Sequence, residues 1–383
     1  MTRAGGWGSL ALIYLYGVAS AASLSKAIPL EQHLAALPGA GSGSFALYMA
    51  LMAVLPAVLG TLGGGLIDRI GARPALMFAA LCGAAVNAAY ALSDSIVAFL
   101  ALRVVEGLIP LAVYAAAPAL MISTSAPTRR SAAMALWSTY TPVGTSLGLI
   151  IAAGFASGQH WRAAYVMHGA VFAALAAAAL LLPTSTAAPG PRPSPLSLLS
   201  GREGLRPLRL ALAFGLLILL GLGVSVVFPS WLSRQQGVSV ASASRILAAA
   251  NLVMIVGGTV SGVLLGRGVR PAVLFVLLAV CGCLAGTAIF MPEPGLAAII
   301  AALVGWSLCT GAAMAVLAAR LPHVVSAAHR AAAAGLLSQT GALLTFVTPS
   351  VWLTAQGTGH WSALASIVVA GWLAAALLLP GRG

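Results

Sequence analysis

The sequence predicts an all-α polytopic membrane protein with twelve transmembrane helices in two related six-helix bundles. Hydrophobic residues make up 61% of the 383 positions and charged residues only 7%, so a water-soluble surface cannot be assembled from the remainder. Apolar stretches follow one another along the whole chain, and a Pro-rich polar segment interrupts them near the middle. Lipid is therefore the expected main solvent of this protein.

The apolar stretches are long enough to cross a bilayer. A hydrocarbon core about 30 Å thick needs about 20 mostly apolar residues per helix. The first six predicted spans are 9–30, 45–67, 75–93, 96–122, 132–156 and 162–182. The other six are 208–232, 243–265, 272–291, 295–319, 331–355 and 362–380. An even number of crossings predicts that both ends of the chain lie on the same side.

Positive charges predict which side that is, because loops rich in Arg and Lys remain in the cytoplasm. With the N-terminus inside, the cytoplasmic segments hold Arg3, Arg69, Arg73, Arg129, Arg130, Arg192, Arg202, Arg206, Arg209, Arg267, Arg270, Arg320, Arg330 and Arg382. The outer segments and helix ends hold only Lys26, Arg162, Arg234 and Arg245. Both termini are therefore expected in the cytoplasm. This pattern also accounts for the formal charge of +13, so we expect no nucleic-acid partner.

Three segments follow from this reading: an N-terminal bundle at 1–182, a cytoplasmic linker at 183–207 and a C-terminal bundle at 208–383. The linker is rich in Pro, Ser, Gly and Arg and cannot bury enough apolar area to fold alone. The two bundles look like repeats. At a spacing of two hundred residues, the matching pairs are Arg130 and Arg330, Ser138 and Ser338, Thr145 and Thr345, and His160-Trp161 and His360-Trp361.

A short cytoplasmic loop between the second and third spans reads Gly-Gly-Leu-Ile-Asp-Arg-Ile-Gly-Ala-Arg-Pro at residues 64–74. This loop resembles the signature of the major facilitator superfamily, and a degenerate copy follows the second span of the second half. The resemblance covers the whole chain and implies the fold of that superfamily and transport by alternating access. Leu265 stands where the first copy has Asp68, so the second copy departs from the pattern.

The loop supplies the conformational gating residues that the sequence predicts. Gly65 allows helices to approach closely, and Gly71 permits a tight turn. Asp68 facing the start of the eleventh span, near Ala331, would meet the positive end of a helix dipole and latch the halves, as the resemblance implies. Arg69 and Arg73 either anchor in anionic headgroups, pair with Asp68 or only set topology.

Arg103 and Glu106 lie in the fourth span, three positions apart and so on one helical face. With Gly107, they resemble the Arg-x-x-x-Gly element of this superfamily. A charge in hydrocarbon is costly unless it is paired or hydrated, so both are functional candidates. Glu106 exchanging a proton would couple transport to the proton gradient. A permanent ion pair is the equally weighted alternative.

Lys26 is the only lysine of the chain and lies near the outer end of the first span, before Pro29 and Glu31. Two interpretations stay open for it. As a compact cation facing a cavity, it would hold an anionic substrate. Alternatively, it extends to the outer interface beside Glu31.

Other polar residues are candidates for a solute-binding cavity. Tyr140, Ser338 and Gln339 rank first, because the fifth and eleventh spans line the cavity in a fold of this superfamily. The remaining candidates are Tyr14, Tyr114, Asn87, Ser138, Asn251 and Trp306. His168, alone on the sixth span, is expected to be a hydrogen-bonded core residue. Pro142 and Pro349 stand at related places and are expected to bend helices that flex during gating.

The function that these features predict is secondary active transport of a small organic or anionic solute, coupled to protons. Residues 137–142, together with Arg103, Glu106 and Gly107, also resemble the cyanate-transporter-like branch of the superfamily. The alternative is proton-antiport export of a drug or metabolite, since Pro142 with Gly144 and Gly148 loosely resembles an antiporter motif. A non-transporting receptor on the same scaffold also stays open.

Enzymatic activity is not expected, because the few acids and histidines form no catalytic cluster at membrane depth. The four cysteines lack the spacing of a zinc or redox site, and no phosphate-binding loop is present. We therefore expect no metal and no cofactor. The expected partners are a small-molecule substrate, the lipid bilayer and protons, with the chain as a monomer. High Ala and Gly and scarce Lys suggest a bacterial cytoplasmic (inner) membrane protein.

Overall fold

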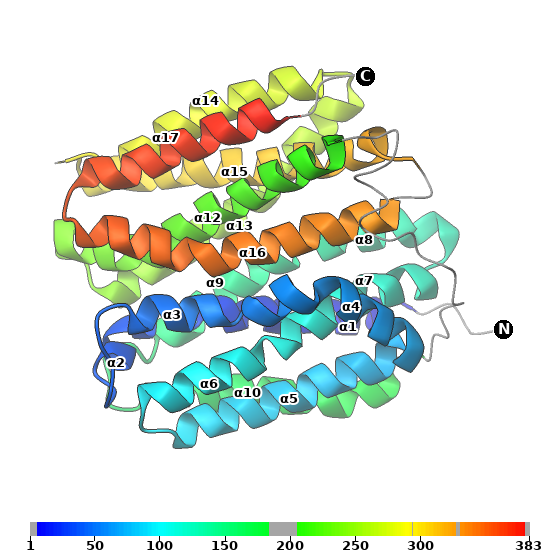
Figure 1. Ribbon diagram of the computed structural model, residues 1–383, viewed down its shortest axis with the longest axis horizontal. Coiled ribbons are helices and arrows are strands. Elements are labelled where there is room, and N and C mark those ends of the chain that lie inside the picture. Colours follow the sequence, from blue (N-terminus) through cyan, green and yellow to red (C-terminus); the bar gives the residue numbers. More distant parts are fainter. Residues whose placement is uncertain (1–5, 184–204, 293, 327–329, 380–383) are drawn as a thin grey trace. The chain divides into compact units, whose positions relative to one another are not determined.

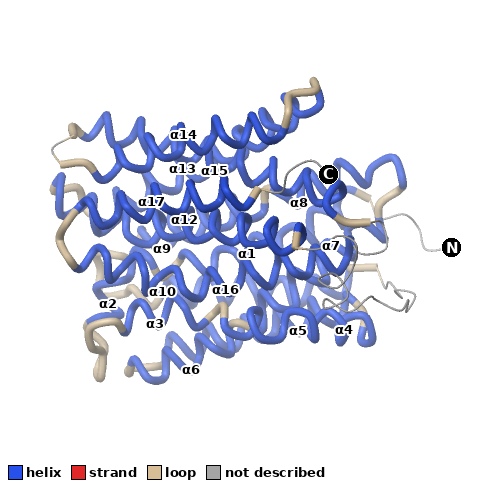
Figure 2. The backbone as a smooth tube through the Cα atoms, turned by 45° about the horizontal axis from the view of Figure 1, so that its top comes forward, coloured by secondary structure: helices blue, strands red, loops and turns tan. Residues whose placement is uncertain are grey.

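The computed structural model describes residues 6–183, 205–292, 294–326 and 330–379. The side chains of residues 61–65, 68, 330 and 331, which lie inside helices, are outside this description. Figure 2 shows that the described backbone consists of helices joined by loops. The chain divides into two compact units, with the boundary between Gly190 and Pro191. Most of the predicted linker, residues 183–207, lies outside the described residues.

The first unit contains the six predicted spans of the N-terminal half (Figure 1). Its α-helices are α1 (Trp7–Ser25), α2 (Glu31–Ala35), α3 (Ser44–Leu51), α4 (Val54–Ile70), α5 (Ala72–Leu92), α6 (Ile96–Glu106), α7 (Leu108–Thr124), α8 (Arg130–Ser138), α9 (Tyr140–Ala153) and α10 (Ala163–Ala178). Four of the six spans are therefore broken into shorter helices.

Prolines explain three of these breaks. Proline lacks the N–H that would bond to the carbonyl four residues earlier, and its ring crowds that carbonyl. In three cases the proline follows the last residue of a helix by four positions, the pairs being Ser25 and Pro29, Glu106 and Pro110, and Ser138 and Pro142. The sequence thus ends α6 at Glu106 and α1 just before Lys26.

The second unit is built from longer helices. They are α12 (Arg206–Gln236), α13 (Val240–Gly266), α14 (Pro271–Phe290), α15 (Leu296–Val324), α16 (Arg330–Gly357) and α17 (Trp361–Leu378). Pro349 lies inside α16, which continues past it. Pro142, by contrast, follows a break between two helices, so the two prolines have different local effects.

The twelve predicted spans all correspond to helical segments. Among the described residues, ten segments are long and apolar enough to cross a membrane. The predicted span at 45–67 appears as a shorter apolar helix at Ser44–Gly60, and the span at 132–156 is divided between α8 and α9. The predicted all-helical membrane fold with twelve helices is confirmed.

The helices of the two units pair in the same way, which supports the repeat seen in the sequence. In the first unit the pairs in contact include α1 with α9, α4 with α7, α5 with α10, α5 with α7 and α1 with α7. In the second unit the corresponding pairs are α12 with α16, α13 with α15, α14 with α17, α14 with α15 and α12 with α15. In these five pairs, each helix of the first unit is replaced by its counterpart in the second.

One packing contact occurs in both units at matching positions. A Cβ added to Gly83 on α5 would lie 2.5 Å from the ring of Phe172 on α10. A Cβ added to Gly282 on α14 would lie 2.5 Å from the ring of Trp372 on α17. The two glycines stand about two hundred positions apart in the sequence, and so do the two aromatic residues. These four residues therefore mark equivalent positions in the two units.

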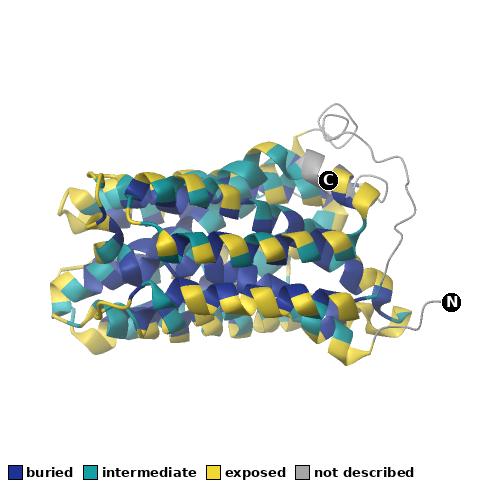
Figure 3. Cartoon of the chain, turned by 90° about the horizontal axis from the view of Figure 1, so that it is seen from below, coloured by how far each residue is buried: buried dark blue, intermediate teal, exposed yellow. Residues whose placement is uncertain are grey.

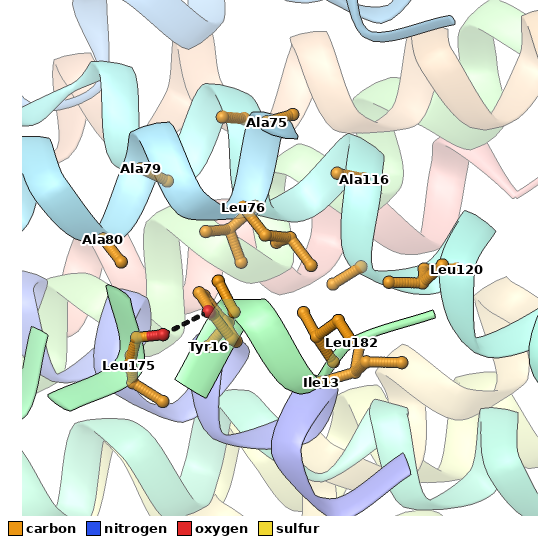
Figure 4. Packing of buried hydrophobic residues seen from close by; sticks show 14 of the residues in the cluster. Ile13, Tyr16, Ala75, Leu76, Ala79, Ala80, Ala116, Leu120, Leu175 and Leu182 are labelled. Atoms are coloured by element: carbon orange, nitrogen blue, oxygen red, sulfur yellow. Dashed lines mark hydrogen bonds between the residues drawn. The ribbon is translucent and has the colours of Figure 1, made fainter. Parts of the chain in front are cut away.

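The interior of the first unit holds small and branched apolar side chains from α1, α5, α7 and α10 (Figure 4). Tyr16 is buried there, and its hydroxyl donates to the Leu175 carbonyl at 2.6 Å, which ties α1 to α10. Residues coloured as exposed repeat along the outer sides of the helices (Figure 3). Many of them are large and apolar, including Leu92, Val97, Leu180, Leu284, Leu373 and Leu377. Such a surface is suited to lipid.

Candidate functional site

Three charged side chains meet in the interior of the first unit. Lys26 follows the last residue of α1, and Arg103 and Glu106 lie at the end of α6. The exposed fraction is 3% for Lys26 and 0% for Arg103 and Glu106. Asn87 on α5 and His168 on α10 complete the group. These five residues are called the charge cluster below.

Lys26 is the centre of the charge cluster. Its ammonium group donates to Asn87 Oδ1 at 2.6 Å, to Glu106 Oε1 at 2.9 Å and to His168 Nδ1 at 3.2 Å. All three of its N–H donors therefore have acceptors. The alternative that Lys26 extends to the outer interface is wrong, because the side chain is buried among α5, α6 and α10.

Glu106 accepts hydrogen bonds from three donors. Lys26 contacts Oε1, while Arg103 Nη1 and the Tyr90 hydroxyl contact Oε2 at 2.7 and 3.0 Å. Arg103 and Glu106 form the ion pair that their spacing permits, and Lys26 adds a second cation to it. One carboxylate is thus shared by two cations.

Arg103 is fixed by backbone groups as well as by Glu106. Its Nε donates to the Tyr48 carbonyl at 3.1 Å and Nη1 donates to the Ser23 carbonyl at 3.0 Å. The guanidinium lies over the Tyr48 ring, 4.5 Å from its centroid. The buried Nη2 atom has no hydrogen-bond partner among the described residues. Arg103 therefore connects α6 to α1 and α3 and retains an unused donor.

His168 orients Lys26 through a single ring tautomer. The Lys26 ammonium can only donate, so Nδ1 of His168 must accept. The other ring nitrogen, Nε2, lies 3.0 Å from the Ala19 carbonyl, which can only accept, so Nε2 carries the proton. This assignment from the hydrogen-bond network makes His168 neutral. The expectation of a hydrogen-bonded core histidine holds, but its partner is Lys26.

Sequence reasoning missed Tyr90 and His168 as members of this site. A signal was present, because Asn87 and Tyr90 stand three residues apart, as do Tyr165 and His168. The same spacing joins Arg103 to Glu106. A polar pair at this spacing on each of three apolar spans marks one polar face per helix. The tertiary structure turns the three faces toward Lys26.

The charge cluster carries a net positive charge. Lys26 and Arg103 contribute two positive charges, Glu106 one negative charge and neutral His168 none, which leaves one positive charge. The Lys26 ammonium also lies 4.9 Å from the centroid of the Tyr165 ring, a contact that stabilises a cation without neutralising it.

A small cavity of about 30 Å³ adjoins Lys26 and His168 between α1, α9 and α10. This volume is about that of one water molecule, and the walls of the cavity are almost entirely apolar. The cavity is lined by Ala22, Lys26, Gly148, Ile151, Ala164, Met167, His168 and Val171. Met167 and Val171 are exposed on the surface of α10, so the cavity lies between the charge cluster and the lateral surface of the unit.

The second unit has no counterpart of the charge cluster among its described residues. The Cβ that Gly286 lacks would contact Trp306 and Val368. These three residues stand 199 or 200 positions after Asn87, Glu106 and His168, respectively. In the first unit, those three residues bind the Lys26 ammonium. Buried apolar residues stand two hundred positions after Lys26, Arg103, Glu106 and His168, namely Val226, Leu303, Trp306 and Val368.

The predicted gating loop is described in part. Gly71 has φ 91° between α4 and α5, which a side chain would resist, so the predicted tight turn is present. Gly268 in the second copy has φ 86°. Arg69 is exposed and Arg73 half-buried. The predicted contact of Asp68 with the start of the eleventh span near Ala331, and the close approach at Gly65, lie outside the description, which covers only the backbone at these three residues.

The other predicted residues are spread over both units. Tyr140 begins α9, and its ring packs on Trp137 and Tyr114 at centroid distances of 4.4 and 5.2 Å. Pro142 is buried in the first turn of α9, and Pro349 is buried within α16. Ser338 is exposed and Gln339 half-buried on α16. Within the described residues, no group of His, Cys, Asp and Glu could hold a metal ion.

A twelve-helix bundle of two repeats, with a buried charge cluster in the core of one of them, is the architecture of a membrane transporter. The sequence matches the family model for the Major Facilitator Superfamily over residues 9–349, and the chain belongs to this family. A comparison with curated proteins gave no match.

Solved transporter structures share the fold. A bacterial homologue of the human lysosomal transporter Spinster, inward-facing and unoccupied, has a TM-score of 0.73 at 16% identity, over 97% of this chain and 94% of its own. The occupied form of that protein has a TM-score of 0.74 at 16% identity, over 97% of this chain and 93% of its own. The nucleoside transporter NupG, solved as a point mutant, has a TM-score of 0.78 at 12% identity, over 97% of this chain and 100% of its own. At these identities the likeness establishes the fold.

Proposed function

We propose that this protein is a secondary active transporter that moves a small organic or anionic solute by alternating access, coupled to protons. The observation that carries this proposal is the charge cluster, which is buried in one repeat while the matching core of the other repeat is apolar. Family membership supports transport as such.

The contrast between the repeats argues against a purely structural role for the charges. Burying a charge at membrane depth is costly, and replacing a buried ion pair by well-packed apolar residues is often neutral or stabilising. The second unit contains such apolar packing on the same helix arrangement, with Leu303 and Trp306 fully or almost fully buried. Helix packing therefore does not require Arg103 and Glu106, which supports a role in coupling.

The sign of the charge cluster supports an anionic solute. Two cations share one carboxylate, so the field that this site produces is positive. Lys26, Arg103 and Glu106 are the proposed coupling residues. Tyr140, Ser338 and Gln339 are proposed to contact the solute.

The gating part of the proposal involves the loop at 64–74. Gly65, Asp68, Arg69, Gly71 and Arg73 are proposed to control opening on the cytoplasmic side. Pro142 and Pro349 are proposed to permit bending of the fifth and eleventh spans. The break between α8 and α9 at Thr139 supports flexing near Pro142. We place the protein in a bacterial cytoplasmic (inner) membrane as a monomer with both termini in the cytoplasm.

Export of a drug or metabolite by proton antiport is the second candidate. Its support is the packing of α9 on α1, where Gly144 and Gly148 allow very close approach to Val18 and Ala22. Together with the break before Pro142, these glycines resemble the antiporter motif of the family. A helix held this closely can rock as one body with α1.

Transport assays on the purified protein in liposomes test the proposal. The panel should contain labelled small carboxylates and cyanate, with neutral and cationic drugs as the contrasting set. Accumulation of an anion under an imposed pH gradient, together with counterflow of the same anion, is the expected result. Extrusion of drugs alone would favour the antiport candidate. A lack of counterflow for every solute that binds would instead indicate a receptor.

A further inference from the structure

We propose that the exchangeable proton of the charge cluster is carried by Lys26 rather than by Glu106. This inference rests on the proposed proton coupling and names the atom that performs it. Two observations carry it: the net charge of the cluster and the contacts of each ionisable group.

The net charge favours loss of a proton over gain. With Lys26 and Arg103 charged and Glu106 ionised, the cluster holds one uncompensated positive charge at membrane depth. Protonation of Glu106 would raise this to two, in a medium where isolated charges are strongly disfavoured. Deprotonation of Lys26 would bring the cluster to zero. Proton exchange at Lys26 therefore changes the cluster charge between one and zero, whereas exchange at Glu106 would change it between one and two.

The contacts of Glu106 fit a permanent carboxylate. Its two oxygens accept from Lys26, Arg103 and Tyr90. A proton on either oxygen would turn an acceptor into a donor and oppose one of these three bonds. Arg103 cannot take the role either, because a guanidinium does not lose its proton in proteins. Lys26 is the remaining group that can.

Lys26 keeps two of its three contacts when it loses a proton. The neutral amine still has two N–H donors and gains a lone pair. The two donors serve Glu106 Oε1 and Asn87 Oδ1, the acceptors at 2.9 and 2.6 Å. The contact with His168 Nδ1, at 3.2 Å, is the longest of the three and the one released.

Water takes up the proton in the proposed step. An N–H bond of the ammonium breaks, its electron pair stays on Nζ, and the proton leaves as hydronium on water that reaches Lys26 in one of the states of alternating access. The cavity of about 30 Å³ beside Lys26 and His168 is almost wholly apolar and too small for an organic anion, so it does not hold a solute that would neutralise the cluster.

The groups that face Lys26 come from every helix packed around it. α6 presents Glu106 and Arg103, α5 presents Asn87 and Tyr90, and α10 presents Tyr165 and His168. α9 contributes Gly148 and Ile151, which do not titrate. One anion and one further cation thus surround the ammonium, so its own charge is the surplus one.

Lys26 is the only lysine of the sequence, which makes a direct test possible. Protein grown with ¹⁵N-labelled lysine and placed in lipid nanodiscs has a single side-chain ¹⁵Nζ signal. We expect this signal to change from ammonium to amine across the pH range in which the protein transports. Infrared difference spectra over that range should show no protonated-carboxyl band from Glu106. The variant Glu106→Gln is the comparison that would assign such a band to this residue. An ammonium signal at every pH, or such a Glu106 band, would overturn the inference.

The variant Lys26→Arg provides the functional test, since it keeps a cation that cannot release its proton. We expect it to lose accumulation driven by a pH gradient. A thermal unfolding transition in detergent close to that of the wild type establishes that the variant is folded. If gradient-driven accumulation survives in Lys26→Arg, Lys26 is not the proton carrier.

The two proposals fail in different ways. If the wild type transports no solute under a pH gradient, the proposed function is wrong, and the ¹⁵Nζ titration still decides which residue holds the proton. If the wild type transports but Lys26 stays charged throughout, proton-coupled transport stands and the assignment to Lys26 falls.

Discussion

Lys26 Nζ lies 2.9 Å from Glu106 Oε1, although the two residues stand eighty positions apart. The contact joins the end of α1 to the end of α6, and both helices end there because a proline follows four residues after their last residue. The two termini thus deliver opposite charges to one point in the interior.

The effect of removing one charge should depend on which charge is removed. Glu106→Gln leaves two buried cations without a counter-ion and should cost about 3–5 kcal/mol of the free energy of unfolding. Lys26→Met leaves Arg103 paired with Glu106 and should cost about 1–3 kcal/mol, from the acceptors that lose Lys26. Chemical denaturation in detergent measures both. Asp94→Asn is the matched control, because Asp94 is 86% exposed in its pair with Arg162 and should change stability by about 0–1 kcal/mol.

Removing all three charges together should be tolerated better than removing Glu106 alone. The triple variant Lys26→Met, Arg103→Leu, Glu106→Gln has no unpaired charge and resembles the apolar core of the second unit, where Leu303 occupies the matching position. We expect a folded protein, as stable as Glu106→Gln or more so, with no gradient-driven transport. An unfolded triple variant beside a folded Glu106→Gln would mean that the charges hold the bundle together.

Alanine at the two matching glycines should destabilise both units. A Cβ at Gly83 or Gly282 would meet an aromatic ring at 2.5 Å, so Gly83→Ala and Gly282→Ala should each cost about 1–3 kcal/mol. Thermal unfolding in detergent measures the effect. Gly262→Ala, on α13 with nothing within 4 Å of the added Cβ, should be neutral or slightly stabilising. Equal effects at all three sites would show that close packing is not the cause.

Alanine at Gly71 should strain the loop between α4 and α5. With φ 91° and ψ 152°, this position lies in a region that glycine occupies almost alone, so Gly71→Ala should cost about 1–3 kcal/mol. Gly266→Ala, on the last turn of α13 with open space around it, serves as the control. If the loop acts in gating, the transport rate of Gly71→Ala should fall more than its stability alone explains. A wild-type rate and stability would contradict the assigned turn.

Loss of one hydroxyl should report on the bond between α1 and α10. Tyr16→Phe removes the donor to the Leu175 carbonyl but leaves that carbonyl with its helical partner, the N–H of Ala179. The expected cost is therefore about 0.5–1.5 kcal/mol, measured by thermal unfolding in detergent, with transport retained. Tyr14→Phe, which loses a contact with Thr139 beside the helix break, gives a comparison of similar chemistry.

The sequence by itself determined the twelve spans, because bilayer thickness fixes the length of an apolar helix and polar loops separate one helix from the next. It also determined the turn at Gly71, the pairing of Arg103 with Glu106 and the repeat of two hundred residues. Each of these depends on local spacing. The breaks after Glu106 and Ser138 were not predicted, because the predicted spans 96–122 and 132–156 run through both positions.

Only the tertiary structure decided what Lys26 does. Local sequence allowed it to reach the outer interface, since nothing near it along the chain supplies the acceptors that it uses. Those acceptors come from Asn87, Glu106 and His168 on three other helices, and their distance along the chain hides them. Hydrophobic patterning says that a helix is buried, but which polar faces meet inside the bundle depends on how the helices pack.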